Sequence, residues 1–186
     1  MLLASAMIPA FAQNASLEVT GVDAALLAKA NAGDGASQVL VGDSYAAGKG
    51  VPRNSAQAVA WYAKAAAQGN VAAELRLAAL YRDGSKGFQR DMAQAAAWYR
   101  KAADAGDSGA QATLGVLYSM GQGVPHNDVE AYYWLDLAAQ APGPDQGKYL
   151  ANRQLVGTRI TTDELEAVEE RVANWKIAKP RADGGQ

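Results

Sequence analysis

The stretch that decides the fold is GKGVPRNSAQAVAWYAKAAAQGN, residues 48–70. A second stretch, GQGVPHNDVEAYYWLDLAAQ at residues 121–140, repeats its glycine turn, its polar helix start and its tryptophan. Recurrence at a fixed spacing is the sequence signature of a protein built from stacked repeat units. The chain is therefore expected to consist of such units, with turns and aromatic residues serving the same structural purpose in each.

Aromatic residues mark three units along the chain. In each unit a tyrosine is followed, 16 or 17 residues later, by a tryptophan: Tyr45 and Trp61, Tyr81 and Trp98, Tyr118 and Trp134. This spacing divides the chain into units at residues 35–70, 71–107 and 108–142. The segments are rich in alanine, which favours helix strongly, so each unit is predicted to contain two helices.

The ends of the helices recur as well. A glycine closes the first helix of each unit and a polar residue begins the second, at Gly48 and Asn54, Gly84 and Asp91, Gly121 and Asn127. Glycine can adopt the left-handed conformation past a helix end, and Asn or Asp accepts a backbone N–H that the helix leaves unpaired. Small residues three positions before each tyrosine should let the paired helix approach closely; they are Gly42, Ala78 and Gly115.

The tryptophans are predicted to be core residues. They recur once per unit, as a solenoid needs, which favours packing over the alternative of stacking on a ligand. Truncating a buried aromatic residue costs about 3–5 kcal/mol. Because the middle unit has neighbours on both sides, we expect Trp98→Ala to destabilise the protein most.

These residues together resemble the Sel1-like repeat, a relative of the tetratricopeptide repeat. The shared motifs are GKGVP at 48–52, GQGVP at 121–125, WYAKAA at 61–66 and WYRKAA at 98–103. The middle turn, GSKGF at 84–88, and Leu135 in the place of a tyrosine depart from the pattern. The resemblance covers residues 35–142. It implies an all-α fold, a right-handed superhelical solenoid of helix-turn-helix pairs.

The flanking segments are interpreted as caps of the array. Residues 23–34 match the end of a second helix and are predicted to form an N-terminal half-repeat, after a linker at 13–22. Residues 143–178 are predicted to form C-terminal capping helices. The last of these opens with a capping box from Thr161 to Glu164, and its apolar stripe consists of Leu165, Val168, Val172 and Trp175. Residues 179–186 are expected to be a disordered tail.

The N-terminus predicts export. Residues 1–12, MLLASAMIPAFA, form an apolar run that ends in the small-x-small pattern Ala10-Phe11-Ala12, which suits cleavage before Gln13. The run is too short to span a bilayer, so no stable membrane insertion is expected after cleavage. A bacterial protein with this signal would be periplasmic or secreted. An ordinary apolar first helix is the alternative, since no lysine or arginine precedes the run.

Composition argues against several kinds of chemistry. The 186 residues include 17 Lys and Arg, 19 Asp and Glu, one His and no Cys, for a formal net charge of −2. A nucleic-acid-binding protein needs a basic surface, and thiolate metal sites and thiol nucleophiles need cysteine. The lone His126 has no evident metal-ligand or catalytic partner, and the Gly-x-Gly stretches follow helices, unlike phosphate-binding loops. We therefore predict no catalytic, metal or cofactor site.

A groove along the first helices is the remaining candidate site. By analogy with tetratricopeptide arrays, the first helices line the concave side of the solenoid. The candidate binding residues are Asp43, Leu75, Ala79, Arg82, Val116 and Ser119, on a strip that also holds Val39, Ala46 and Ala112. Packing of first helices on one another is an equal alternative for Val39, Leu75 and Ala112. Arg82 is the strongly charged residue of the strip and is suited to hold a carboxylate.

Two functions follow as hypotheses. Sel1-like proteins commonly serve as scaffolds in signalling, secretion and envelope maintenance, so the resemblance implies an exported, non-enzymatic adaptor that binds a protein or peptide through the concave face. The alternative is a cell-envelope enzyme or accessory acting on peptidoglycan or a β-lactam. That alternative requires a cleft that gathers carboxylates or a serine with a base.

Overall fold

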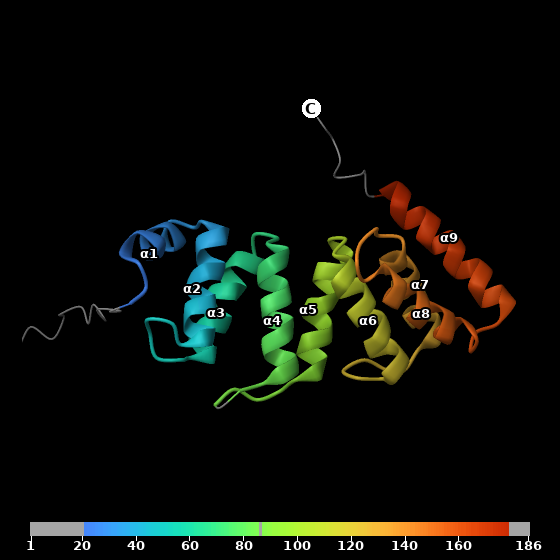
Figure 1. Ribbon diagram of the computed structural model, residues 1–186, viewed down its shortest axis with the longest axis horizontal. Coiled ribbons are helices and arrows are strands. Elements are labelled where there is room, and N and C mark those ends of the chain that lie inside the picture. Colours follow the sequence, from blue (N-terminus) through green and yellow to red (C-terminus); the bar gives the residue numbers. More distant parts are fainter. Residues whose placement is uncertain (1–20, 86, 179–186) are drawn as a thin grey trace, which may run out of the picture.

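The computed structural model describes residues 21–85 and 87–178, and these fold into nine α-helices (Figure 1). Their bounds are α1 Ala24–Asn31, α2 Gly35–Ala47, α3 Ser55–Ala66, α4 Val71–Asp83, α5 Met92–Asp104, α6 Ser108–Met120, α7 Asp128–Ala139, α8 Gln146–Gly157 and α9 Thr162–Ala178. An isolated bridge joins Ser85 and Phe88. The all-α prediction is confirmed.

The helices pair in the order that the repeats predict. α2 packs on α3, α4 on α5 and α6 on α7, and the pairs follow one another in a row along the long axis of the molecule (Figure 1). α1 packs on α2 at one end, whereas α8 and α9 pack on α7 at the other. The predicted signal segment, residues 13–20 of the linker and the C-terminal tail lie outside the described residues.

Asparagine and aspartate side chains begin the helices of every unit. Asn54, Asp91 and Asn127 accept the N–H of the third residue of α3, α5 and α7, at 3.1, 3.0 and 3.0 Å. The backbone N–H of each of these caps also donates to the carbonyl of the unit's tyrosine, at 2.9, 2.8 and 3.0 Å. The same two interactions therefore fix the turn in all three units, including the middle one.

Small residues allow close contact within the outer helix pairs. A Cβ at Gly42 would lie 2.5 Å from Cε1 of Tyr62, and a Cβ at Gly115 would lie 2.7 Å from Cγ of Leu135. A Cβ at residue 42 would require the Tyr62 ring to move, and one at residue 115 would press on both the Leu135 side chain and the backbone of α7. The sequence prediction for these positions is confirmed.

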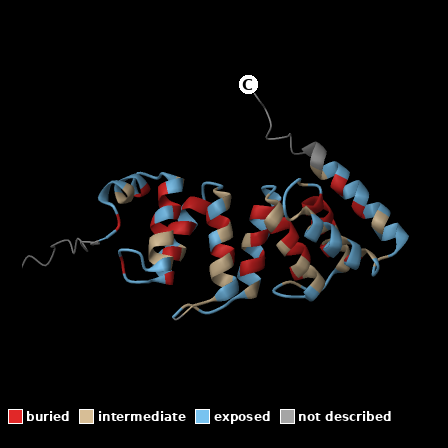
Figure 2. Ribbon diagram, in the orientation of Figure 1, coloured by how far each residue is buried: buried red, intermediate tan, exposed pale blue. Residues whose placement is uncertain are grey.

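The core runs between the paired helices, and α9 contributes only isolated buried positions to it (Figure 2). Trp134 is 1 % exposed and Trp61 is 9 % exposed, so both are core residues. Trp98 is only partly buried and packs at the edge of the core. The prediction that all three tryptophans are core residues is therefore corrected for Trp98, and because Trp134 is the more deeply buried side chain we expect Trp134→Ala to destabilise the protein more.

A buried side chain at one repeated position joins each unit to the preceding one. Gln38 in α2 donates to the carbonyl of Ala30 at 3.1 Å, and Gln111 in α6 donates to the carbonyl of Ala103 at 3.2 Å. Both glutamines are buried. Each thereby connects the start of a first helix to the end of the helix before it.

Glu74 holds the same position in α4. Its side chain is 7 % exposed, and its Oε2 has no hydrogen-bond partner among the described residues. The equivalent carbonyl is that of Ala66, which accepts the Gly69 N–H as Ala30 and Ala103 accept from their own glycines. An ionised carboxylate has no proton to donate to a carbonyl. Burial accordingly raises the pKa of Glu74.

The middle turn absorbs one extra residue. Ser85 and Phe88 exchange two backbone hydrogen bonds at 2.8 and 2.9 Å, and the Phe88 ring packs against Tyr81 with centroids 5.2 Å apart. The hydroxyls of Ser85 and Ser55 lie 2.6 Å apart, which ties this turn to the start of α3. The extra residue is accommodated without changing the turn closure between Tyr81 and Asp91.

Candidate functional site

Two grooves follow the first helices of the units. One, of about 690 Å³, lies mainly between α2 and α4; the other, of about 530 Å³, lies mainly between α4 and α6. Leu40, Ala46, Ala79 and Leu80 supply apolar surface to the first groove. Leu40 is 52 % exposed, so an apolar side chain of the first groove faces solvent.

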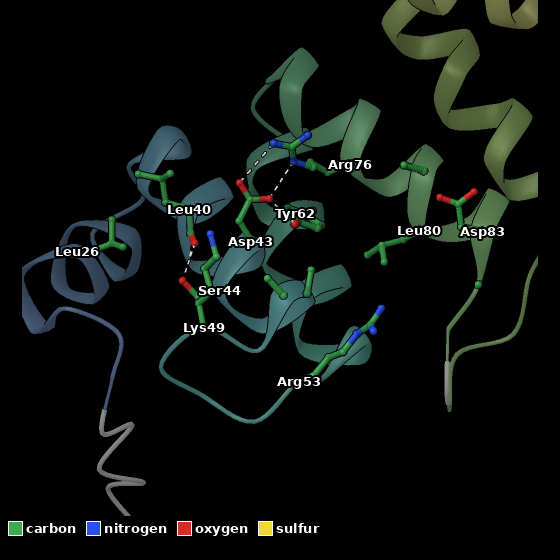
Figure 3. Close-up of a pocket in the computed structure, with 14 residues that line it drawn as sticks. Leu26, Leu40, Asp43, Ser44, Lys49, Arg53, Tyr62, Arg76, Leu80 and Asp83 are labelled. Atoms are coloured by element: carbon green, nitrogen blue, oxygen red, sulfur yellow. Dashed lines mark hydrogen bonds and ion pairs between the residues drawn. The ribbon is translucent and has the colours of Figure 1, made fainter.

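An ion pair bridges the first groove (Figure 3). The guanidinium of Arg76 in α4 donates from Nε to Oδ1 of Asp43 in α2 at 2.8 Å, and the Tyr62 hydroxyl donates to the same carboxylate at 2.6 Å. Burial and the Asp43 carboxylate raise the pKa of Tyr62 well above its usual value. These contacts neutralise the Asp43 charge and hold α2, α3 and α4 in register.

A second pair stands where the two grooves meet. Arg82 donates to both carboxylate oxygens of Asp83, at 2.7 and 3.0 Å, and to the Tyr99 hydroxyl at 2.9 Å. These hydrogen bonds lower the pKa of Asp83, whereas burial raises the pKa of Tyr99. The planar fork of Arg82 is thus already occupied within the protein.

The structure divides the predicted binding residues. Asp43 and Ala79 line the first groove, and Arg82 and Val116 line the second. Leu75 packs against the core instead, and Val39 and Ala112 are buried, so these three stack the helices on one another. Ser119 accepts a hydrogen bond from Arg159 Nη2 at 2.6 Å.

Sequence reasoning identified Arg82 but did not place Lys49, Arg53 and Arg90 at the grooves. Lys49 and Arg53 line the first groove on the side of the α2–α3 turn, and Arg90 lines the second (Figure 3 shows the first two). Within residues 21–85 and 87–178, these three side chains form no ion pair or side-chain hydrogen bond. Aligning the three units indicates two of these residues, because Arg53 and Arg90 both stand immediately before a helix cap.

His126 occupies the corresponding position in the third unit. Its Nε2 lies 3.4 Å from Oδ1 of Asp128, which is also 2.9 Å from the Arg159 guanidinium.

The described part of the chain contains no group of three or more His, Cys, Asp or Glu residues placed to hold a metal ion. None of its helices is both long enough and apolar enough to span a bilayer.

Comparison with known proteins identifies the repeats. The family model of the Sel1 repeat matches residues 35–70, 71–107 and 108–142, which are the three units. Among solved structures, a Sel1 repeat protein from Oxalobacter formigenes is 32 % identical, with a TM-score of 0.60 over 69 % of this chain and 96 % of that one.

A second solved structure is a protective antigen of uropathogenic Escherichia coli that displays an SLR fold. It is 27 % identical and the match covers 87 % of this chain and 44 % of the antigen, with a TM-score of 0.47. No curated protein matches the chain.

Proposed function

Because the chain belongs to the Sel1 repeat family, we propose that it is an exported adaptor that binds a protein or peptide along its first-helix grooves. Sel1 repeat proteins typically mediate protein–protein interactions, and the fold is generally a non-enzymatic scaffold. The specific partner, the binding surface and the export are the parts that this proposal adds.

The observation that carries the proposal is the succession of two grooves on one face. Equivalent positions of α2, α4 and α6 supply their walls, so a ligand longer than one unit can run across both. The ion pair between Asp43 and Arg76 holds the walls of the first groove in place before a ligand arrives. A preorganised surface loses less conformational entropy on binding.

Site-specific photo-crosslinking tests the surface. Benzoylphenylalanine at Ala79 lies in the first groove, and the same residue at the exposed Ala97 of α5 serves as the matched control. In a periplasmic extract, we expect a covalent adduct from the Ala79 variant that disappears when Val116→Asp is added. Adducts that form from Ala97 and not from Ala79 would place the binding surface on the second helices.

Export is tested separately by intact-mass measurement of protein from the cell-envelope fraction. Cleavage between Ala12 and Gln13 should remove the first twelve residues, and Ala12→Leu should block the cleavage because signal peptidase requires a small residue there. Protein that keeps Met1 and stays in the cytoplasm would refute the export.

A further inference from the structure

One basic residue recurs at the same place in every unit. Arg53, Arg90 and His126 each precede the cap of a second helix and lie against the glycine that closes the first helix. A Cβ at Gly48 would be 3.2 Å from Arg53 Cβ, one at Gly84 3.0 Å from Arg90 N, and one at Gly121 3.4 Å from His126 Cβ. We call these three residues the basic row.

The two acidic residues that line the grooves are engaged mainly by arginines outside this row. Asp43 is neutralised by Arg76 and Asp83 by Arg82, at 2.8 and 2.7 Å. Among the described residues, Arg53 and the neighbouring Lys49 form no ion pair, whereas Arg90 lies close enough to Asp83 to help lower its pKa; the lining of each groove still holds one more basic than acidic residue. The protein as a whole has a formal net charge of −2, which makes this local excess a property of the groove edge.

Interaction with the helix dipole leaves the side chains of Arg53 and Arg90 able to bind a ligand as well. A cation near a helix C-terminus interacts favourably with the helix dipole, but this interaction occupies none of the N–H donors of a guanidinium group. The guanidinium groups of Arg53 and Arg90 are exposed and keep all their N–H donors available. Each can form two parallel hydrogen bonds with one carboxylate.

Apolar surface lies beside the row in both grooves. Leu40 and Leu80 lie on opposite sides of the first groove, and Met92 and Val116 line the second. In an extended peptide, successive side chains point to opposite faces, so one face can be apolar and the other acidic. Such a peptide would place apolar side chains on the floor and carboxylates at the edge.

We infer that the partner of this protein presents an extended segment in which apolar and acidic residues alternate, with its carboxylates bound by Arg53 and Arg90. The inference rests on the proposed function and specifies the chemistry of the ligand. His126 contributes less to the row, because Asp128 already lies beside its ring.

Fluorescence anisotropy with a synthetic probe tests the inference. The probe is a fluorescein-labelled peptide of ten residues in which leucine and glutamate alternate, about 33 Å long when extended. The matched control replaces each glutamate by glutamine, which keeps the shape and removes the charge. We expect the acidic peptide to bind the full chain at least tenfold more tightly, and the difference to shrink between 50 and 500 mM salt.

Charge-reversed variants locate the interaction. Arg53→Glu combined with Arg90→Glu should weaken binding of the acidic peptide at least tenfold. The matched variant is Lys64→Glu combined with Lys101→Glu, which makes the same change in net charge on α3 and α5, outside both grooves. It should bind within threefold of the unmodified protein, and melting curves of both variants confirm folding.

Four results would overturn the inference. They are equal binding of the two peptides, no binding of either at 1 mM, an equal loss in both double variants, and a dimer of the unmodified chain that Arg53→Glu dissociates. The last would show that the groove takes a second copy. If Ala79 still crosslinks to a partner after either of the first two results, the adaptor proposal stands and only the ligand chemistry is wrong.

Discussion

The middle unit and its two neighbours share one backbone design but differ in how they join the unit before them. In the first and third units, a buried glutamine donates to the last turn of the preceding helix. In the middle unit, Glu74 stands at that position with one carboxylate oxygen unpartnered. Where the other units have a glutamine amide, Glu74 has a carboxylate, so a buried hydrogen-bond donor is replaced by an acceptor. The geometry of the repeat stays the same.

This comparison shows that repeats of equal shape need not be equally stable. In a solenoid, stability is approximately the sum of unit stabilities and of the interfaces between neighbours. The interface between the first two units lacks one hydrogen bond and buries an acidic group. At the position of Glu74, the junction of α3 and α4 therefore lacks a stabilising contact that the equivalent positions in the other two units have.

The largest expected difference between units concerns the tryptophans. Trp134→Ala should cost about 3–5 kcal/mol of unfolding free energy, because it empties a fully buried site. Trp98→Ala should cost about 2 kcal/mol, because Trp98 is only partly buried. Urea unfolding followed by circular dichroism measures both. Equal losses would show that the middle and third units bury this residue alike.

A smaller effect is expected when the third unit is given the side chain of the middle one. Gln111→Glu removes a donor from a buried site and leaves the Ala103 carbonyl without it, so we expect a loss of about 1–3 kcal/mol at pH 7. The same urea titration measures it. The control is Gln111→Met, which fills the site without a charge; if Gln111→Glu is the milder change, the glutamine bond is not what joins the units.

The reverse exchange should stabilise the protein. Glu74→Gln restores the donor toward Ala66, with an expected gain of about 1 kcal/mol at pH 7. Burial raises the pKa of Glu74, with a lowering contribution from Lys101 and a raising one from Asp104. The glutamate form thus loses stability as the pH rises from its unfolded pKa toward its folded one.

The advantage of Glu74→Gln should therefore shrink at low pH, where the carboxyl is protonated and can itself donate. Melting temperatures of the two proteins between pH 3.5 and 7.5 measure the difference. A gain that is the same at every pH would mean that Glu74 titrates with its ordinary pKa and that its burial has no electrostatic cost.

The smallest expected effect concerns the middle turn. Gln89 occupies the position of Pro52 and Pro125, and Gln89→Pro should stabilise by about 0.4–1 kcal/mol by restricting the unfolded chain. Thermal unfolding measures the change, with Gln89→Ala as the control. Destabilisation would show that the pairing of Ser85 with Phe88 has moved residue 89 away from the backbone conformation that proline needs.

Much of the fold could be predicted from the sequence because it depends on local, repeated chemistry. The glycine turns, the caps at Asn54, Asp91 and Asn127 and the close contacts at Gly42 and Gly115 act over a few residues or between paired helices. The depth of Trp98 could not be predicted, since it depends on how neighbouring units stack. That stacking involves residues distant in sequence.

The candidate binding site could be predicted less completely than the fold, because it also depends on contacts between residues distant in sequence. Analogy with tetratricopeptide arrays indicated Asp43, Ala79, Arg82 and Val116 as groove residues, and all four line a groove in the structure. It did not reveal that Arg82 is engaged by Asp83 and Tyr99, nor that Arg76 reaches Asp43 across 33 positions of sequence. Ion pairs between units depend on rotamers and on the distance between helices, which spacing alone does not fix.

The packing of α9 has a consequence for the outer surface of the array beyond α7. α9 covers α7 with Val168 and Val172, which are almost completely buried, and turns Glu166, Glu169 and Glu170 outward. An array of identical units is head-to-tail by construction, and such contacts generate open filaments unless something ends them. With its apolar side packed on α7, α9 presents an acidic outer side, which is the polar face that terminates a repeat array.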